Sequence, residues 1–273
     1  MKNNYIKFWG VRGSNPTADS DKMIFGGDTS CIEVRTSNNE LIILDMGTGI
    51  RNLGSKILSD PSYPKTIHIF LSHFHWDHIM GFLYFTPFYD KSFTFNIYGF
   101  NKNTSTLSFS KKILDPTFWP VSMDMLDAKI NFFDLEDNRL AISSKTSVSY
   151  TNHTHPNSAT SYRVETDGHS TVYTTDCEHP KHLNKNVLEI AKNADVLIHD
   201  SHFSEKDLIN YKGWGHSSWQ QAIEVAKLAN VKHLFLFHYN PNYNDEDVSN
   251  LEKAAQQNFK NVTASKQGMK ISF

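Results

Sequence analysis

The feature that most constrains the fold is a short histidine-rich segment that directly follows a strongly apolar strand. Residues 66–72, TIHIFLS, are typical of a buried β-strand because apolar and β-branched side chains dominate them. The segment HFHWDH then places four possible metal ligands within six residues, namely His73, His75, Asp77 and His78. Imidazoles and carboxylates at this density predict a strand-end site for two divalent cations. The alternative is a surface loop that happens to be rich in histidine.

Composition excludes several other classes of protein. The chain has 14 His but only two Cys, Cys31 and Cys177, which argues against a disulfide-stapled domain or a thiolate zinc site. Lys and Arg total 27 against 29 for Asp and Glu, so the formal net charge is -2 and no overall basic field attracts polyanions. We therefore expect no long nucleic acid as substrate. The N-terminal residues lack a signal-peptide core and no stretch approaches the ~18 apolar residues of a membrane span, so we expect a cytoplasmic protein without membrane contact.

The chain shows no linker, repeat or low-complexity tract, so we expect one domain over residues 1–273. Alternating apolar patterns predict strands at residues 6–13, 30–36, 40–47, 66–72, 129–135, 146–152, 161–166, 170–176, 196–200, 233–239 and 268–273. Helices are predicted at residues 50–58, 183–193, 218–228 and 245–257. Asp167-Gly168 is typical of a hairpin turn between two of the strands. Two mixed sheets packed face to face with helices outside, an αββα sandwich of the α/β class, would accommodate this order.

The segment HFHWDH resembles the HxHxDH signature of the metallo-β-lactamase superfamily, and the resemblance extends over nearly the whole chain. In that family a His, a bridging Asp and a final His follow at later strand ends. This chain supplies His155 before Pro156, Asp176 in YTTDCE and His238 in LFLFHYNP. The resemblance implies two metals with Asp176 between them, one held by His73, His75 and His155 and the other by Asp77, His78 and His238. His153 is the alternative to His155, but the His-Pro pair matches the family better.

Two more carboxylates match family positions beside the metals. Asp45, in LDMGTG after a predicted strand, corresponds to a carboxylate that orients a ligand imidazole through its second nitrogen. A strand-end turn residue is the alternative for Asp45. Asp200, in VLIHDSHF, matches a carboxylate next to the site, either as a supporting residue or as a partner of a helix dipole. Both are therefore candidates for a supporting shell.

The segment GWGHSSW around His216 resembles the Gly-His-Ser-Thr segment of ribonuclease Z and of class II cyclic-nucleotide phosphodiesterases. In those enzymes the His protonates the leaving oxygen or grips the phosphate, and Ser218 here replaces the usual Thr. A surface His near a helix N-cap is the alternative for His216. The stretches FWGVRGSNP, FGGDTSC and LDMGTGIRNLG resemble a phosphodiesterase-like subgroup, which usually has Asn where Asp28 stands.

The resemblance implies a metal-dependent phosphodiesterase that hydrolyses a small, cyclic nucleotide through a hydroxide bridging two Zn²⁺ or Mn²⁺ ions. His216 would act as general acid, and Asp77 is counted among the catalytic residues as well as the ligands. Alternatives are a ribonuclease Z-like RNA endonuclease, a lactonase of the same fold, and a binding module without turnover. Short spacing between motifs and net charge argue against the ribonuclease. Similarity to the cyclic-nucleotide phosphodiesterases also implies a homodimer.

Overall fold

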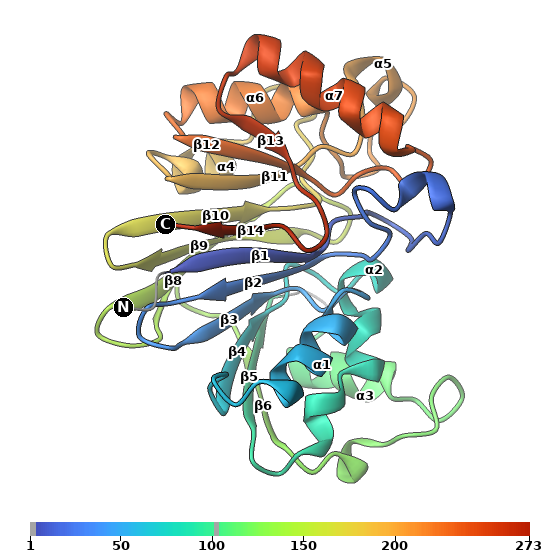
Figure 1. Cartoon of the computed structure of the whole chain (residues 1–273), viewed down its shortest axis with the longest axis vertical. Coiled ribbons are helices and arrows are strands. Elements are labelled where there is room, and N and C mark those ends of the chain that lie inside the picture. Colours follow the sequence, from blue (N-terminus) through green and yellow to red (C-terminus); the bar gives the residue numbers. More distant parts are fainter. Residues whose placement is uncertain (1–3, 101–103) are drawn as a thin grey trace. The chain divides into compact units, whose positions relative to one another are not determined.

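The computed structural model describes residues 4–100 and 104–273 and contains two seven-stranded β-sheets, each with its own helices (Figure 1). Residue contacts divide the chain into two compact units. The first unit comprises Met1–Gly10, Asp28–Leu135 and Gln267–Phe273, and the second comprises Val11–Gly27 and Glu136–Lys266. Each sheet lies within one unit, and the single domain expected from the sequence stays a prediction.

The first unit contains a sheet with the strand order β14-β1-β2-β3-β4-β5-β6. Its strands are β1 Tyr5–Gly10, β2 Cys31–Arg35, β3 Leu41–Leu44, β4 Thr66–Phe70, β5 Thr94–Gly99, β6 Lys129–Asp134 and β14 Lys270–Ser272. The strands from β3 to β6 run parallel, whereas β14, β1, β2 and β3 pair antiparallel. Its helices are α1 Ile50–Ser59, α2 Trp76–Ile79 and α3 Thr106–Ile113, with 3-10 turns at Met80–Tyr84, Thr86–Tyr89 and Met123–Met125. The sheet is therefore mixed.

Apolar periodicity explains how α1 packs on this sheet. Ile50, Leu53 and Ile57 recur at helical spacing and are buried, while Ile67 and Ile69 of β4 alternate toward one face. All five belong to one hydrophobic cluster, which also includes residues of β3, β5 and α3. Figure 1 shows α1 and α3 beside these strands. The core of the first unit therefore lies between its helices and its sheet.

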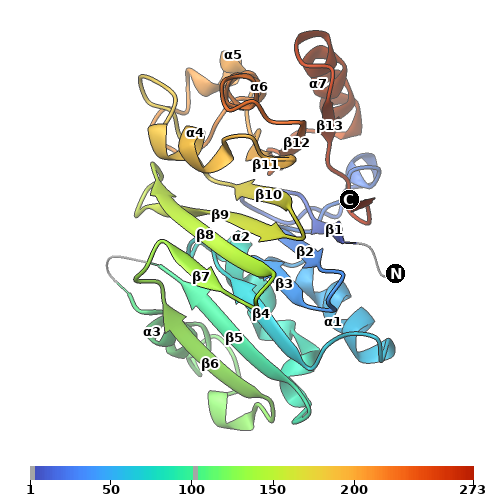
Figure 2. The ribbon, with the colours of Figure 1, turned by 90° about the vertical axis from the view of Figure 1, so that its left-hand side faces the viewer.

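The second unit contains a sheet with the strand order β13-β12-β11-β10-β9-β8-β7. Its strands are β7 Arg139–Ala141, β8 Thr146–His153, β9 Ala159–Thr166, β10 His169–Thr174, β11 Val196–Asp200, β12 His233–Phe237 and β13 Val262–Ala264. Its helices are α4 Lys185–Ala191, α5 Glu205–Leu208, α6 Trp219–Leu228 and α7 Asp245–Asn258, with a 3-10 turn at Ser20–Lys22. The strands β7 to β10 pair antiparallel, as Figure 2 shows for β8, β9 and β10, and β10 to β13 pair parallel. Positive φ at Asp167 and Gly168 closes the predicted β9–β10 hairpin.

Several elements differ from the sequence prediction. Strand β5 and helix α3 were not predicted, because apolar residues between positions 86 and 125 recur with neither a helical nor a strand spacing over a long stretch. The three-residue strands β7 and β13 are held by neighbours in the sheet and are too short to leave a pattern of their own. Across the described ranges 4–100 and 104–273, the helices include none that is long and apolar enough to span a membrane.

Candidate metal centre

The first group of predicted ligands lies where β3 and β4 end. These strands run parallel with Leu44 paired to Phe70, so the residues that follow both strands leave the sheet at the same edge. Asp45 follows β3 in the left-handed region, with φ 64°, a conformation that costs free energy for a residue with a Cβ. His73 and His75 follow β4. The strand ends therefore bring a buried carboxylate next to the histidine-rich segment.

Asp45 fixes the orientation of His78 through hydrogen bonds within this edge. Its Oδ2 accepts from Nδ1 of His78 at 2.7 Å, and its two oxygens accept from the backbone N and the hydroxyl of Ser72 at 2.6 and 2.8 Å. Because a carboxylate only accepts, the His78 proton is assigned to Nδ1. Nε2 of His78 then faces Oδ2 of Asp77 at 3.1 Å. The hydrogen bond between Asp45 and Nδ1 of His78 is the contact expected of a carboxylate that orients a ligand imidazole.

The other two imidazoles complete the group in the first unit. The ring of His73 lies 4.5 Å from that of His75 and 4.4 Å from that of His78, measured between centroids. His73, Asp77 and His78 are buried, and His75 is partly exposed. The structure thus brings together all four ligands predicted in HFHWDH, and we call them the β4 cluster.

The second group lies at the carboxyl ends of three parallel strands, β10, β11 and β12. Asp176 follows β10, Asp200 ends β11, and His238 follows β12. Asp176 and His238 both have positive φ, 51° and 64°. Carboxyl ends of parallel strands form one edge of a sheet, where ligands commonly bind. We call Asp176 with His155, Asp200, His216 and His238 the Asp176 cluster.

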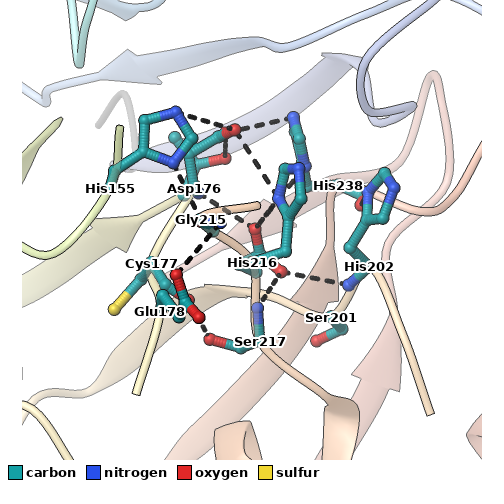
Figure 3. Close-up of polar contacts among 12 residues, drawn as sticks. His155, Asp176, Cys177, Glu178, Ser201, His202, Gly215, His216, Ser217 and His238 are labelled. Atoms are coloured by element: carbon teal, nitrogen blue, oxygen red, sulfur yellow. Dashed lines mark hydrogen bonds and ion pairs between the residues drawn. The ribbon is translucent and has the colours of Figure 1, made fainter. Parts of the chain in front are cut away.

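Three imidazoles surround the carboxylate of Asp176, which is 2% exposed (Figure 3). Oδ2 lies 3.1 Å from Nε2 of His238, and Oδ1 lies 3.8 Å from Nε2 of His155. Nδ1 of His216 is 3.6 Å from Oδ1. The hydroxyl of Thr175 donates to Oδ2 at 2.8 Å. The arrangement collects the imidazole and carboxylate donors that bind zinc and manganese.

Asp200 supports this group from the buried side. Its Oδ2 accepts from Nδ1 of His216 and from the backbone N of Asp176, each at 3.0 Å, and its Oδ1 accepts from the backbone N of His202 and Ser217. Burial opposes ionisation of Asp200, but the charge and hydrogen bond of His216, followed by the charge of His238, outweigh it and lower the pKa to about 2. Asp200 is therefore an ionised carboxylate that holds His216.

His155 and His153 have different surroundings. His155 donates from Nδ1 to the carbonyl oxygen of Gly215 at 2.9 Å, which directs Nε2 toward Asp176. His153 Nε2 lies 3.0 and 3.2 Å from the carbonyl oxygens of Thr175 and Asp176, and its Nδ1 lies 2.9 Å from the Ser161 hydroxyl. The structure therefore brings His155 to the Asp176 carboxylate and ties both ring nitrogens of His153 to other partners.

Two residues of the second unit contact this cluster although the sequence did not assign them to it. The His202 ring stacks on His216 with 4.1 Å between centroids and an interplanar angle of 12°, and its Nδ1 donates to the carbonyl oxygen of His238 at 2.9 Å. Glu178 accepts from the backbone N of Gly213 at 2.6 Å and of Gly215 at 3.2 Å, which anchors the segment before His216 (Figure 3). Their only sequence signal is nearness to Asp200 and Asp176.

The remaining candidates lie outside these contacts. Trp76 and Trp214 are 57% and 61% exposed, whereas Trp119 packs partly buried against the core of the first unit. Asp28, which departs from the resembling subgroup, accepts from Nδ2 of Asn52 at 3.1 Å and from Nε2 of Gln267 at 2.7 Å. These bonds tie Asp28 to the first unit and give it a structural role.

Comparison with known proteins identifies the family. A family model described as a beta-lactamase superfamily domain matches residues 41–239, well over half of the chain. The chain belongs to this family. The metallo-β-lactamase fold protein YhfI from Bacillus subtilis superimposes with a TM-score of 0.73 at 21% identity and covers 100% of both chains. The fold class predicted from the sequence, two mixed sheets flanked by helices in the metallo-β-lactamase fold, is confirmed.

Curated relatives are named ribonuclease Z. The one from Archaeoglobus fulgidus is 39% identical over 108 residues, which cover 38% of this chain and 32% of that relative. The one from Thermoplasma volcanium is 27% identical over 273 residues, which cover 82% of this chain and 84% of the relative. This chain covers only 32%, 25% and 24% of the length of three relatives named ribonuclease Z, from Archaeoglobus fulgidus, Enterococcus faecalis and Picrophilus torridus. The short form of human tRNase Z shares the fold, with a TM-score of 0.69, 18% identity and 98% of each chain covered.

These relatives correct one expectation. The prediction that no long nucleic acid is a substrate was wrong, since the matched relatives are named as ribonucleases that act on RNA and tRNA. The physical reason is that net charge averages over the whole surface, and a chain with a formal net charge of -2 can still present local cationic surfaces. The homodimer and the cytoplasmic location stay predictions.

Proposed function

We propose that this chain is a metal-dependent phosphodiesterase and that its substrate is a small cyclic nucleotide. The observation that carries the proposal is the pairing of His216 with the ionised carboxylate of Asp200, beside a carboxylate that faces two further imidazoles. Such a pair can hold and deliver a proton at an exact position, which an ester with a poor leaving group requires. The resemblance of GWGHSSW to phosphodiesterase segments supports the same role.

The donor set fits divalent cations. Both clusters offer imidazole nitrogens and carboxylate oxygens, which suit zinc and manganese. The ligands would be His73, His75, Asp77 and His78 of the β4 cluster and His155, Asp176 and His238 of the Asp176 cluster. Their division between two ions, with Asp176 shared, is implied by the family resemblance alone and stays a prediction. When bound, such ions supply positive charge for phosphoryl oxygens and activate water at neutral pH.

The side chains of the Asp176 cluster divide the remaining tasks. Asp200 accepts the Nδ1 proton of His216, so proton exchange with a substrate falls to Nε2. Glu178 holds the backbone on the N-terminal side of His216, and His202 covers one face of its ring. His216 is therefore fixed in position before a substrate arrives, as general acid catalysis requires. The sugar oxygen that leaves when a cyclic 3',5' ester is opened would take its proton from this imidazole.

A comparison of two leaving groups tests the role of His216. His216→Ala should keep its metals yet lose roughly 10²- to 10⁴-fold in turnover of a cyclic nucleotide, because the departing alkoxide needs a proton. The loss should be much smaller on bis(p-nitrophenyl) phosphate, since nitrophenolate departs without one. Equal losses on both substrates at unchanged metal content would contradict a general acid and leave a phosphate-binding or structural role.

The second candidate function is hydrolysis of RNA phosphodiesters, which the relatives named ribonuclease Z favour. The same side chains would serve, because the bond cleaved is also a phosphodiester. The metal-loaded protein should therefore be offered cyclic mononucleotides, a precursor tRNA and an acyl lactone in parallel. If the precursor tRNA is turned over far faster than every cyclic nucleotide, RNA is the substrate and not a small nucleotide. If only the lactone is turned over, the proposal of phosphodiester hydrolysis is wrong.

A further inference from the structure

A polar hollow of about 540 Å³ lies in the first unit, between the last turn of α1 and the strands β1, β2 and β14. Four cationic side chains line it, Lys7, Arg35, Lys56 and Lys270. Among the residues that the structure describes, the hollow has one carboxylate in its lining, Asp60, which pairs with Lys56 at 3.0 Å. A chain with a formal net charge of -2 thus concentrates positive charge at this place. We call it the basic hollow.

Strand register places like charges directly opposite each other in the basic hollow. Lys7 of β1 pairs with Lys270 of β14 on one side and with the buried Glu33 of β2 on the other, and Tyr5 pairs with Arg35 of β2. Like charges at paired positions destabilise a sheet. Burial lowers the pKa of Lys7, the nearby Glu33 opposes this shift, and the charges of Lys56 and Lys270 add to it. Glu33 therefore offsets part of the repulsion among these cations, and an anion in the basic hollow would offset more of it.

Aromatic rings hold these cations in place. Nζ of Lys7 lies 3.7 Å from the centroid of the Trp9 ring, and Nζ of Lys270 lies 3.8 Å from that of Tyr5. The guanidinium of Arg35 lies over the Tyr63 ring at 4.5 Å. A cation over an aromatic face is attracted without being neutralised. The positive charges are thus fixed while they stay available to a ligand.

Arg35 gives the second, independent indication of a ligand. The residue is 5% exposed, and its Nη2 donates to Oδ1 of Asn39 at 2.6 Å and to the carbonyl oxygen of Ser62 at 2.5 Å. Its buried Nη1 has no hydrogen-bond partner within residues 4–100 and 104–273. A buried donor without an acceptor costs roughly 1–3 kcal/mol. An anion in the basic hollow would supply the acceptor once the guanidinium turned toward it, because Nη1 is buried from solvent.

The basic hollow is separate from the β4 cluster. Arg35 pairs with Leu41 at the start of β3, whereas Asp45 follows the other end of the same strand. Asp45 lies four residues after Leu41 along the extended chain, which corresponds to about 13 Å at ~3.3 Å per residue. A ligand in the basic hollow therefore does not occupy the β4 cluster of the same unit.

We propose that the basic hollow binds a small molecule that carries a diphosphate group. Four cations line the hollow against the carboxylate of Asp60, and Glu33 is paired with Lys7, so the excess is two positive charges, which suits a diphosphate better than a single carboxylate. The Ser272 hydroxyl also lines the hollow and can donate to a phosphoryl oxygen, whereas the hydroxyls of Tyr5 and Thr36 already donate to Glu33 and Glu40. The volume falls within the range of small-molecule sites, so there is room for more than the diphosphate itself.

Calorimetric titration of inorganic pyrophosphate into the metal-loaded protein tests this proposal. We expect saturable binding that Lys7→Gln and Lys270→Gln each weaken at least ~10-fold, because each removes a charge facing the ligand. Lys65→Gln is the matched control, since Lys65 also lies over an aromatic ring of the first unit, Phe93 at 3.7 Å, but does not line the hollow. Pyrophosphate should raise the unfolding midpoint of the wild type and of Lys65→Gln more than that of the other two variants.

Binding to the metal centre must be separated from binding to the basic hollow. Asp176→Ala alters the Asp176 cluster and leaves the hollow intact, so one pyrophosphate site should persist in this variant. The proposal is overturned if the wild type does not bind pyrophosphate, or if Asp176→Ala abolishes all binding. Equal affinity of Lys7→Gln, Lys270→Gln and the wild type would also overturn it. Binding of an RNA oligomer in place of pyrophosphate, sensitive to the same lysines, would instead make this surface a nucleic-acid contact.

Discussion

One isosteric substitution, Asp45→Asn, tests how the β4 cluster prepares its ligands. Asp45 accepts from the backbone N and hydroxyl of Ser72 and from Nδ1 of His78. In the variant, the remaining oxygen must stay opposite the backbone N–H of Ser72, because an amide NH₂ there would place two donors face to face. The new NH₂ group then faces His78. His78 has to accept at Nδ1 and carry its proton on Nε2, the nitrogen that would bind a metal.

The expected effects follow from this change of tautomer. A metal ligand needs its lone pair, so we expect the affinity for the ion held by His78 to fall about 10- to 100-fold. The free energy of unfolding of the metal-free protein should fall by about 1.5–3 kcal/mol, the range for one hydrogen bond to a charged group. A domain of ordinary stability has about 5–15 kcal/mol, so Asp45→Asn should remain folded.

Zinc affinity is measured by competition with a chelator, and stability by urea unfolding after metal removal. Asp195→Asn is the matched control, since Asp195 also accepts from the backbone N and hydroxyl of one serine, Ser170, at 2.8 and 3.2 Å. Its third partner is Lys232 at 2.6 Å and not an imidazole, so its zinc affinity should match the wild type. Zinc affinity of Asp45→Asn within twofold of the wild type would refute the proposed control of the His78 tautomer.

Three further predictions concern the Asp176 cluster and assembly. Asp176→Ala should lower metal content and abolish hydrolysis, and elemental analysis that finds two ions at wild-type stoichiometry would contradict a shared ligand. Gly215→Ala should destabilise the protein by more than Gly268→Ala. The two glycines have similar φ, 88° and 87°, so the backbone strain of the substitution is matched. A Cβ at Gly215 would lie 2.0 Å from Nδ1 of His155, whereas a Cβ at Gly268 would meet open space. Urea unfolding compares the two variants. Light scattering should give roughly twice the chain mass of 31.3 kDa, and a mass near 31.3 kDa would contradict the homodimer.

The sequence predicted candidate ligands in two ways, by local spacing after an apolar strand for the β4 cluster and by family resemblance for the Asp176 cluster. His73 to His78 follow one such strand, and their mutual contacts depend on a single chain segment. Asp176, Asp200 and His238 each end or follow a strand that was predicted nearly at its observed bounds. The parallel pairing of those strands, which sequence patterns do not specify, is what gathers them at one edge.

Apart from Asp45 and Asp200, supporting residues could not be predicted from the sequence because their partners are distant in the chain. Glu178 binds the backbone at residues 213 and 215, some 35 positions away, and Ser72 binds Asp45 across 27 positions. A serine or glutamate at such a position has no distinctive neighbours in the sequence. His202 is also hidden, since its stacking on His216 depends on how the segment between them folds back. Identification of these residues requires the tertiary contacts.

Backbone strain at the strand ends connects fold and chemistry most directly. Asp45, Asp176 and His238 each leave a strand with positive φ, 64°, 51° and 64°, at a cost of order 1–3 kcal/mol each. Local bonds offset this cost: Asp45 accepts three hydrogen bonds, and the backbone N of Asp176 donates to Asp200 at 3.0 Å. A relaxed, extended residue would project its side chain along the alternation of its strand. The strained conformation instead turns all three side chains into their clusters, so the same hydrogen bonds that stabilise these turns also aim the candidate ligands.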